Sequence, residues 1–429
     1  MEAFNLWNML QLIFQGIWLL VAQPFQYPSL FWLIVILIAL QYRRMAKMKA
    51  ELFRIEQESS WRPILVAIAF GIFGGMIGSF LLIFFGITIT EAGFLYLWPI
   101  ALLLMLINTR YLCFAYAGGV LSLAAIILGW EAISVAQIMG LVAILHMVEA
   151  LLIYFTGHRS SVPVYISHQK GMTVGGYNLQ SFWPIPLMVL TVVAIPEESS
   201  LATSGMAMPG WWPLIEPPAM EPAVGQMLLF VPLPIVAALG YGDLAVTRPP
   251  REHSRLSAFL LGLYSLILLG LALLASFQPS LAILAALFGP LGHEALILWT
   301  QRRELGGKPF YVPSPWGLRI LGIAQGSPAE KLGLQTGDVV SRVNGHDVRT
   351  RNDLSMAASM SPLHVEVEFL PDGKNEGVWR HKSIEKKWSE PIGIIAAPDE
   401  GEPAQVKLET SGVIERWIGR WKNRNRKNS

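Results

Sequence analysis

Residues 317–345 read GLRILGIAQGSPAEKLGLQTGDVVSRVNG, and this stretch decides the fold of the C-terminal part of the chain. It begins as an apolar strand and turns at Gly326-Ser327-Pro328, where serine suits the cap of a short helix and proline its first turn. Gly333 is a natural end for that helix, because glycine readily adopts the left-handed conformation. A second strand is expected from Val339 to Val343, and Asn344-Gly345 is typical of a tight turn between strands.

This order of strand, helix, strand and turn resembles the PDZ family, in the bacterial form that occurs beside serine proteases and intramembrane proteases. The resemblance covers about residues 313–399. It implies a small β-barrel or sandwich with two helices. Such a domain takes up an extended peptide at a sheet edge beside a helix, and backbone N–H groups receive the C-terminal carboxylate of the peptide.

The carboxylate-binding loop of this family is an apolar-Gly-apolar turn that usually precedes the first strand. Tyr311 to Trp316 is too short for it, whereas a second such run follows the strand His364 to Leu370. We therefore infer a circularly ordered domain whose groove strand, Ile392 to Ala397, comes last and faces a helix from Asn352 to Met360. The alternative is an ordinary final strand without a ligand. The predicted groove residues are Ile392, Gly393, Ile394, Ile395, Leu354, Ala357 and Ala358.

Composition indicates a membrane protein. The 429 residues are 53% hydrophobic and only 14% charged, and most of the charge lies in the last 130 residues. We predict a polytopic α-helical membrane domain of about 8–10 spans over residues 1–307, a cytoplasmic PDZ domain over 308–400 and a basic amphipathic tail over 401–429. The single cysteine, Cys113, excludes a disulfide framework and a zinc cluster built on cysteines.

Ten apolar segments are candidate spans, although the first carries several polar residues and is also compatible with lying in the membrane interface. The glycines between Gly71 and Gly78 would let another helix approach closely. Residues 156–180 are expected to form a cytoplasmic insertion with a small hairpin, and residues 196–223 a Pro-rich extracytoplasmic loop. The candidate spans are Leu6 to Ala22, Ser29 to Tyr42, Ile64 to Ile87, Ala92 to Ile107, Tyr111 to Gly129, Ala132 to Phe155, Phe182 to Ile195, Val224 to Val246, Ala258 to Ser276 and Leu281 to Trp299.

Basic residues predict the orientation, because short loops rich in Lys and Arg stay in the cytoplasm. With the PDZ domain inside and ten crossings, every loop assigned outside lacks Lys and Arg, while Arg110 and the basic segment Arg248 to Arg255 fall inside. The tail Val406 to Ser429 pairs apolar residues at helical spacing with basic ones. It is compatible with binding to anionic lipid and also with a frayed soluble tail.

The sequence provides little support for catalysis. His293-Glu294 begins like the H-E-x-x-H zinc signature of intramembrane metalloproteases, but Ile297 stands where the second histidine is needed. Neither a serine-protease elbow nor a nucleotide-binding glycine pattern occurs. We predict no catalytic residues, no metal site and no cofactor.

Several ionisable residues nevertheless fall inside or beside candidate spans, where they are costly. His146 and Glu149 share one helix face, and Asp243 and His293-Glu294 are expected near the cytoplasmic ends of spans. A transporter would use such groups as a proton path. The interpretation we favour is that they connect helices by hydrogen bonds.

Over nearly its whole length the chain resembles the MinJ family, the membrane PDZ proteins of bacterial division-site selection. The resemblance rests on the many spans before a PDZ domain, on VGGYNLQSFWPIP at 174–186 and on GPLGHE at 289–294. It implies a non-enzymatic scaffold in the bacterial cell membrane at septum and poles, with a MinD-like ATPase, a DivIVA-like coiled coil and peptide C-termini as partners, and no nucleic acid. The alternatives are an accessory or inactive relative of PDZ-containing intramembrane proteases that presents substrates, and a proton-coupled transporter.

Overall fold

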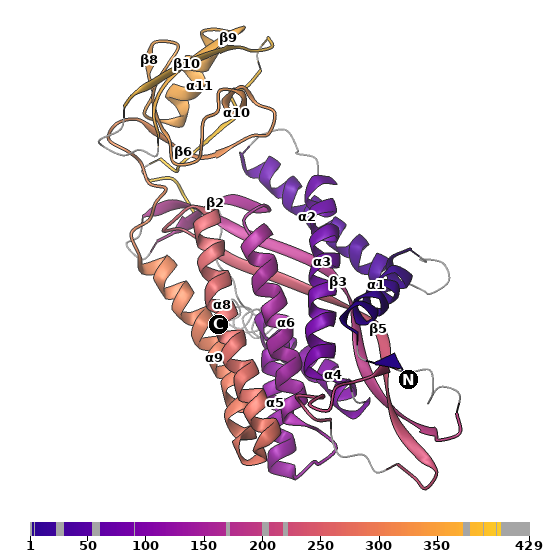
Figure 1. Cartoon of the computed structure of the whole chain (residues 1–429). Coiled ribbons are helices and arrows are strands. Elements are labelled where there is room, and N and C mark those ends of the chain that lie inside the picture. Colours follow the sequence, from indigo (N-terminus) through magenta and orange to yellow (C-terminus); the bar gives the residue numbers. More distant parts are fainter. Residues whose placement is uncertain are drawn as a thin grey trace, which may run out of the picture.

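The computed structural model consists of a helical part with a small β-rich domain at one end (Figure 1). It describes residues 2–3, 5–22, 30–53, 61–89, 91–168, 172–199, 206–217, 222–371, 378–388, 390–399 and 401–404. The basic tail predicted from Val406 lies outside the described residues. A large hydrophobic core fills the helical part, and a separate core fills the C-terminal domain.

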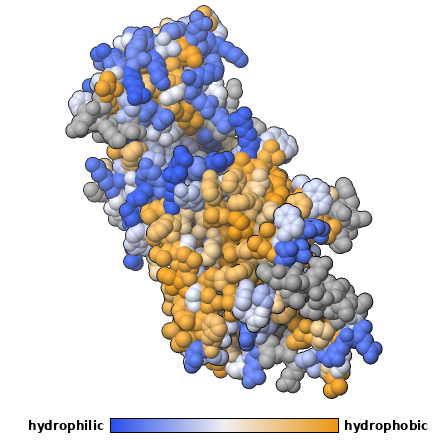
Figure 2. All heavy atoms as spheres, viewed as in Figure 1, coloured by the Kyte–Doolittle hydropathy of each residue, from blue (hydrophilic) through white to orange (hydrophobic). Residues whose placement is uncertain are grey.

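Eight α-helices form the helical part within the described residues, and their surface is largely apolar, in contrast to the hydrophilic C-terminal domain (Figure 2). Trp61–Phe85, Val135–Thr156, Pro250–Phe277 and Pro279–Gly306 are long and apolar enough to cross a membrane, and three shorter apolar helices accompany them. This confirms the predicted helical membrane domain. The helices are α1 (Leu6–Ala22), α2 (Leu30–Phe53), α3 (Trp61–Phe85), α4 (Glu91–Ile107), α5 (Phe114–Leu128), α6 (Val135–Thr156), α8 (Pro250–Phe277) and α9 (Ala282–Gly306), with 3-10 turns η1 (Thr109–Leu112) and η2 (Pro279–Leu281).

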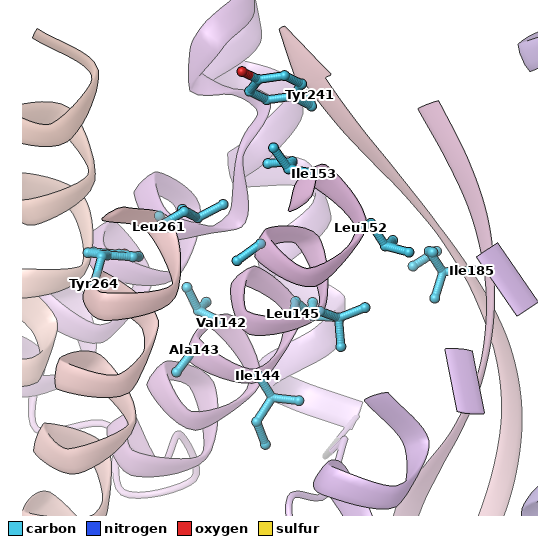
Figure 3. Close-up of a cluster of buried hydrophobic side chains, with 14 of the residues drawn as sticks. Val142, Ala143, Ile144, Leu145, Leu152, Ile153, Ile185, Tyr241, Leu261 and Tyr264 are labelled. Atoms are coloured by element: carbon cyan, nitrogen blue, oxygen red, sulfur yellow. The ribbon is translucent and has the colours of Figure 1, made fainter. Parts of the chain in front are cut away.

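Helix α6 is the centre of this part of the molecule. Its buried side chains, among them Val142 and Leu152, lie between Leu261 and Tyr264 of α8 on one side and Ile185 on the other (Figure 3). Because α6 contacts neighbours all round, nearly its whole surface is apolar. An all-round apolar helix is typical of a buried membrane helix.

Two predicted helical spans, Phe182 to Ile195 and Val224 to Val246, are wrong: both are β-strands. β2 (Ser161–Ser167), β3 (Thr173–Pro196) and β5 (Gln226–Ala245) form an antiparallel sheet in the order β2-β3-β5. The hairpin expected within residues 156–180 is present, but β3 continues far beyond it along the helices (Figure 1). The physical reason is proline, which breaks a helix interior but is tolerated at the edge of a sheet.

The prolines occupy the positions where a strand edge would otherwise have an unpaired donor. In an antiparallel pair, alternate residues turn their N–H groups away from the partner strand. On β3 these outward residues include Pro184 and Pro186, and on β5 they include Pro232 and Pro234, which lie opposite Leu190 and Met188. Without an N–H, none of the four leaves a donor unpaired among apolar helices, where such a donor would be costly.

Two outward residues of β3 that do have an N–H find partners on helices. Phe182 N–H donates to the hydroxyl of Tyr42 on α2 at 3.2 Å, and Met188 N–H donates to Ser79 Oγ on α3 at 2.8 Å. Buried backbone donors in a membrane must be satisfied within the protein. The two hydroxyls therefore satisfy two of the outward donors that remain beside the prolines of β3.

Glycines on α3 let the helix approach this strand edge. A Cβ on Gly71 would lie 2.1 Å from the carbonyl oxygen of Pro184, and a Cβ on Gly75 would lie 2.1 Å from that of Pro186. The sequence predicted that these glycines admit a neighbouring helix. The neighbour is a β-strand, and the close approach itself is as expected.

The C-terminal domain is a six-stranded sheet with two helices. Its strand order is β10-β9-β7-β6-β11, and β8 pairs with β7. Asn344 and Gly345 both have positive φ, at 50° and 76°, as a tight turn between β7 and β8 requires. The elements are β6 (Leu318–Ile323), α10 (Pro328–Lys331), β7 (Val339–Val343), β8 (His346–Asp347), α11 (Arg351–Ser359), β9 (His364–Leu370), β10 (Arg380–Glu385) and β11 (Ile394–Ala396); β1 (Glu2–Ala3) and β4 (Met206–Ala207) form a separate short pair.

Two positional expectations need correction. His293-Glu294 lies near the middle of α9 instead of near its cytoplasmic end. Arg110, expected in a cytoplasmic loop, forms an ion pair with Glu294 at 2.7 Å. The turn between α4 and α5 therefore lies level with the middle of α9 and not with its end. A charged residue at this depth is tolerated because its partner is within the bundle.

We expect Gly71→Ala to lower the free energy of unfolding of the membrane part by about 3 kcal/mol, because the added methyl group meets a carbonyl oxygen that belongs to the backbone. The measurement is the thermal unfolding midpoint of the purified chain in detergent. Gly270→Ala on α8 is the matched control, since a Cβ there meets nothing within 4 Å. Equal midpoints for Gly71→Ala and wild type would contradict the proposed packing.

Candidate peptide-binding edge

Strand β11 is the terminal strand of the C-terminal sheet among the described strands. It pairs antiparallel with β6, with Ile394 opposite Ile323. Ala324 N–H donates to the Gly393 carbonyl at 2.8 Å, so the N–H and C=O of Ile394 point away from β6. Those groups are available to an added strand. We call the outward backbone of Ile394 and Ala396, with the facing residue Ala358 of α11, the binding edge.

A glycine turn leads into the binding edge. Gly393 has a φ of 81°, and a Cβ there would lie 2.2 Å from Cβ of Ser327. Ser327 caps α10, and Ala329 N–H of α10 donates to the Ile392 carbonyl at 3.0 Å. The glycine of the apolar-Gly-apolar run, which predicted a carboxylate loop, is therefore also required by the close packing of this turn on α10.

Helix α11 and the segment around β11 contribute to the same domain core. Leu354 and Ala357 are buried in the same core as Ile392. Ala358 and Ile394 are only half-buried and pack against it from the outside. Of these five residues, Ala358 and Ile394 are therefore the ones whose side chains are accessible at the surface, whereas Leu354, Ala357 and Ile392 are part of the domain core.

The seventh predicted groove residue lies elsewhere. Ile395 points to the opposite face of β11 and belongs to the core of the membrane part, together with Leu321 and Tyr311. Alternation along a strand explains this, because successive side chains point to opposite faces. Ile395 therefore fastens the C-terminal domain to the membrane part.

Tyr165 of β2 occupies one end of the binding edge. Its buried hydroxyl donates to the Ala396 carbonyl at 2.9 Å and accepts a hydrogen bond from the Arg351 guanidinium at the start of α11. The Arg351 guanidinium carbon also lies 5.5 Å from the centre of the Tyr165 ring. Burial raises the pKa of Tyr165, so the hydroxyl keeps its proton for this bond. Sequence reasoning missed Tyr165, because it lies in a hairpin far from the domain in sequence.

Further contacts from β2 and β3 hold the domain. The Tyr177 hydroxyl donates to the Leu321 carbonyl, and Gly175 N–H donates to the Tyr311 carbonyl at 2.9 Å. A Cβ on Gly322 would lie 3.3 Å from the Pro163 ring. The binding edge thus has a defined position relative to the membrane part.

Of the ionisable residues predicted in the spans, Asp243 belongs to one cluster and His146 with His293 to another, while Glu149 belongs to neither. At the end of the bundle near the C-terminal domain, His253 lies between Asp243 Oδ2 at 2.8 Å and Glu304 Oε1 at 3.3 Å. Glu304 also accepts the N–H groups of Val246 and Thr247. This network joins the ends of β5, α8 and α9, as expected for residues that connect elements.

The second cluster lies deeper and was not predicted as a unit. Cys113, His146 and His293 place their Sγ and Nε2 atoms within 4.8 Å of one another. Of the described residues, this is the set that could hold a metal ion. The lone cysteine and the missing second histidine of H-E-x-x-H argued against such a site, and no sequence signal connects a residue in the turn before α5 with residues on two other helices.

Comparison with known proteins agrees with the fold of the C-terminal domain. The family described as PDZ domain matches residues 319–370. The chain contains a PDZ domain. The chain also resembles the cell division topological determinant MinJ of Bacillus subtilis (strain 168), with 26% identity over 281 residues. That match covers 65% of this chain and 64% of MinJ, so it spans less than two thirds of the relative. The predicted resemblance to a MinJ-like PDZ-containing protein is confirmed.

Tyr165→Phe is expected to loosen the hold on the binding edge, because it removes a hydroxyl that bonds both Ala396 and Arg351. Each such bond contributes about 1 kcal/mol. Amide hydrogen exchange over β11 should become several-fold faster in the intact chain. Tyr154→Phe, which alters a half-exposed ring on α6, should leave that exchange unchanged.

Asp353 is expected to stabilise α11 in a pH-dependent way. Its carboxylate accepts the N–H groups of Thr350 at 2.8 Å and Arg349 at 3.1 Å, and these bonds lower its pKa. The stabilisation is therefore complete above the ordinary pKa of 3.8 and is lost as pH falls through the lowered value.

Asp353→Ala should destabilise α11 by about 1 kcal/mol at neutral pH. Exchange of the α11 amides in variant and wild type should converge in acid. Asp353→Asn, which keeps one acceptor, should fall between them. A difference that persists unchanged to pH below the lowered pKa would contradict the assignment.

Proposed function

We propose that this chain is a non-enzymatic membrane scaffold that recruits cell-division proteins through a cytoplasmic PDZ domain. The observation that carries the proposal is a PDZ domain with an outward strand edge, in a chain with membrane-capable helices that resembles MinJ. We take residues 1–307 as the membrane domain, 308–400 as the PDZ domain and 401–429 as a basic tail that binds anionic lipid.

The distribution of basic residues supports a cytoplasmic PDZ domain. Arg159 follows the end of α6, Arg251 lies in the first turn of α8 and Arg303 lies in the last turn of α9. These ends of the three helices are on the side of the PDZ domain (Figure 1). The connections described at the opposite end, 129–134 and 278–281, contain neither Lys nor Arg. Such an asymmetry is typical of cytoplasmic retention of the basic side.

The ligand we infer is an extended peptide, including a free C-terminus, that adds to β11. Its backbone would pair with Ile394, and its side chains would contact Ile394 and Ala358. Ile392, Gly393, Ile395, Leu354 and Ala357 would keep the edge and the turn in place. By resemblance, the peptide would belong to a MinD-like ATPase or a DivIVA-like coiled coil at septum and poles.

Ala358→Arg tests this role, because it places a long side chain beside the binding edge from a half-buried position. We expect it to abolish interaction with division proteins in a bacterial two-hybrid assay and to disperse a fluorescent fusion from septa. Ser355→Gln, on the exposed side of the same helix, should have no effect. Uniform membrane fluorescence of the wild-type chain, with no contact to Min proteins, would reject the division role.

Glu294 supports the non-enzymatic part of the proposal. Its Oε1 pairs with Arg110 at 2.7 Å and its Oε2 accepts the Tyr116 hydroxyl at 2.7 Å. A carboxylate engaged on both oxygens is poorly suited to act as the general base of a metalloprotease. His146, in turn, contacts Val142 and Cys113 and does not form the proton-path pair with Glu149.

We therefore expect wild-type chain and Glu294→Gln to leave a single-span membrane substrate equally intact in a co-expression cleavage assay. The wild-type pattern of septal localisation should be retained. Cleavage by the wild type that disappears in Glu294→Gln would instead establish the alternative, a protease relative that acts on its substrates.

A further inference from the structure

Three potential metal ligands meet in the interior of the helical part. Cys113 Sγ lies 3.1 Å from His146 Nε2 and 3.9 Å from His293 Nε2. Cys113 follows η1, while His146 and His293 lie near the middle of α6 and α9. The cluster therefore joins the turn between α4 and α5 to two helices that are long enough to cross the membrane.

The hydrogen bond at Nδ1 of His146 determines which tautomer the neutral ring adopts. Nδ1 lies 2.7 Å from the Val142 carbonyl oxygen, which can only accept. Nδ1 of neutral His146 therefore carries the hydrogen, and Nε2 turns a lone pair towards the thiol of Cys113. Histidines that bind metals are commonly oriented in this way by a carbonyl group.

His293 is oriented by a chain of polar groups. Tyr116 donates its hydroxyl hydrogen to Glu294 Oε2 at 2.7 Å, so its oxygen accepts from His293 Nδ1 at 3.3 Å. Arg110 holds the Glu294 carboxylate in place through an ion pair at 2.7 Å. Nε2 of neutral His293 then also presents a lone pair to Cys113.

Two lone pairs thus converge on one thiol, which has a single hydrogen to donate. A hydrogen bond with the Cys113 thiol satisfies only one of the two histidines. A metal ion bound by the thiolate satisfies all three groups at once, and the thiol proton is released on binding. The orientation of the imidazoles therefore favours a metal ligand set over a simple hydrogen-bonded pair.

The distances fit a tetrahedral ion. Zinc bond lengths of about 2.3 Å to sulfur and 2.0–2.1 Å to nitrogen place those two ligand atoms about 3.6 Å apart at a tetrahedral angle. The observed separations of 3.1 and 3.9 Å lie on either side of that value. Small side-chain rotations would bring both to it.

We propose that Cys113, His146 and His293 bind one divalent ion of the zinc class, with the fourth position open to water. One thiolate and two imidazoles form a ligand set that suits zinc and, in the laboratory, cobalt. The ion would connect the turn after α4 to α6 and α9. This metal site goes beyond the proposed scaffold role, because that role does not require a metal.

Cobalt binding to the full-length chain in detergent tests the site. Addition of Co²⁺ to chelator-treated wild type should produce a thiolate-to-cobalt charge-transfer absorption that saturates at one ion per chain and disappears when Zn²⁺ is added. Because Cys113 is the only cysteine of the sequence, any such band reports this residue. No band in wild type with an unchanged unfolding midpoint would overturn the proposal and leave a hydrogen-bonded cluster.

Variants separate the ligands from the rest of the chain. His293→Gln should weaken cobalt affinity at least tenfold, and Cys113→Ser should abolish the charge-transfer band. In both variants, Zn²⁺ should no longer raise the unfolding midpoint as it does in wild type. His346→Gln, at an exposed position of the PDZ domain, should behave as wild type. Retention of the full band and midpoint rise in His293→Gln would overturn the assignment of that ligand.

Discussion

The packing of α3 against the edge of β3 is the constraint on which the rest of the structure depends. A β-strand among membrane helices exposes N–H and C=O groups that lipid cannot satisfy. Here prolines remove two donors, hydroxyls of Tyr42 and Ser79 accept two others, and glycines of α3 allow its backbone to lie against the Pro184 and Pro186 carbonyls. The strand can lie this close to α3 because Gly71 and Gly75 have no side chain at the points of contact.

The same strand determines where the PDZ domain lies. β3 starts beside the domain and runs along the bundle to the opposite end (Figure 1). Its Tyr177 contacts Leu321, and the adjoining β2 presents Tyr165 to Ala396. The binding edge is therefore set at a defined place above the membrane, and a partner bound there would be held near the membrane surface.

Two clusters of polar groups inside the bundle connect separate elements. The cluster of Asp243, His253 and Glu304 connects three element ends near the PDZ domain. The deeper cluster around Cys113 and Glu294 holds the turn between two short helices. In the first cluster Glu304 also accepts the N–H groups of Val246 and Thr247, so it satisfies backbone donors just after β5.

The sequence by itself determined the elements whose signals are local. The glycine turns, the Ser327 cap and the alternating strands specified the PDZ domain, and apolar segments of sufficient length specified most of the membrane helices. Short-range backbone preferences and hydrophobic periodicity are enough for these. Only the tertiary structure decided that the proline-containing segments after residue 173 are strands, that Tyr165 reaches the binding edge and that Cys113 meets two histidines. Each of these depends on which distant segment satisfies a buried polar group, and a single chain position carries no signal of its partner.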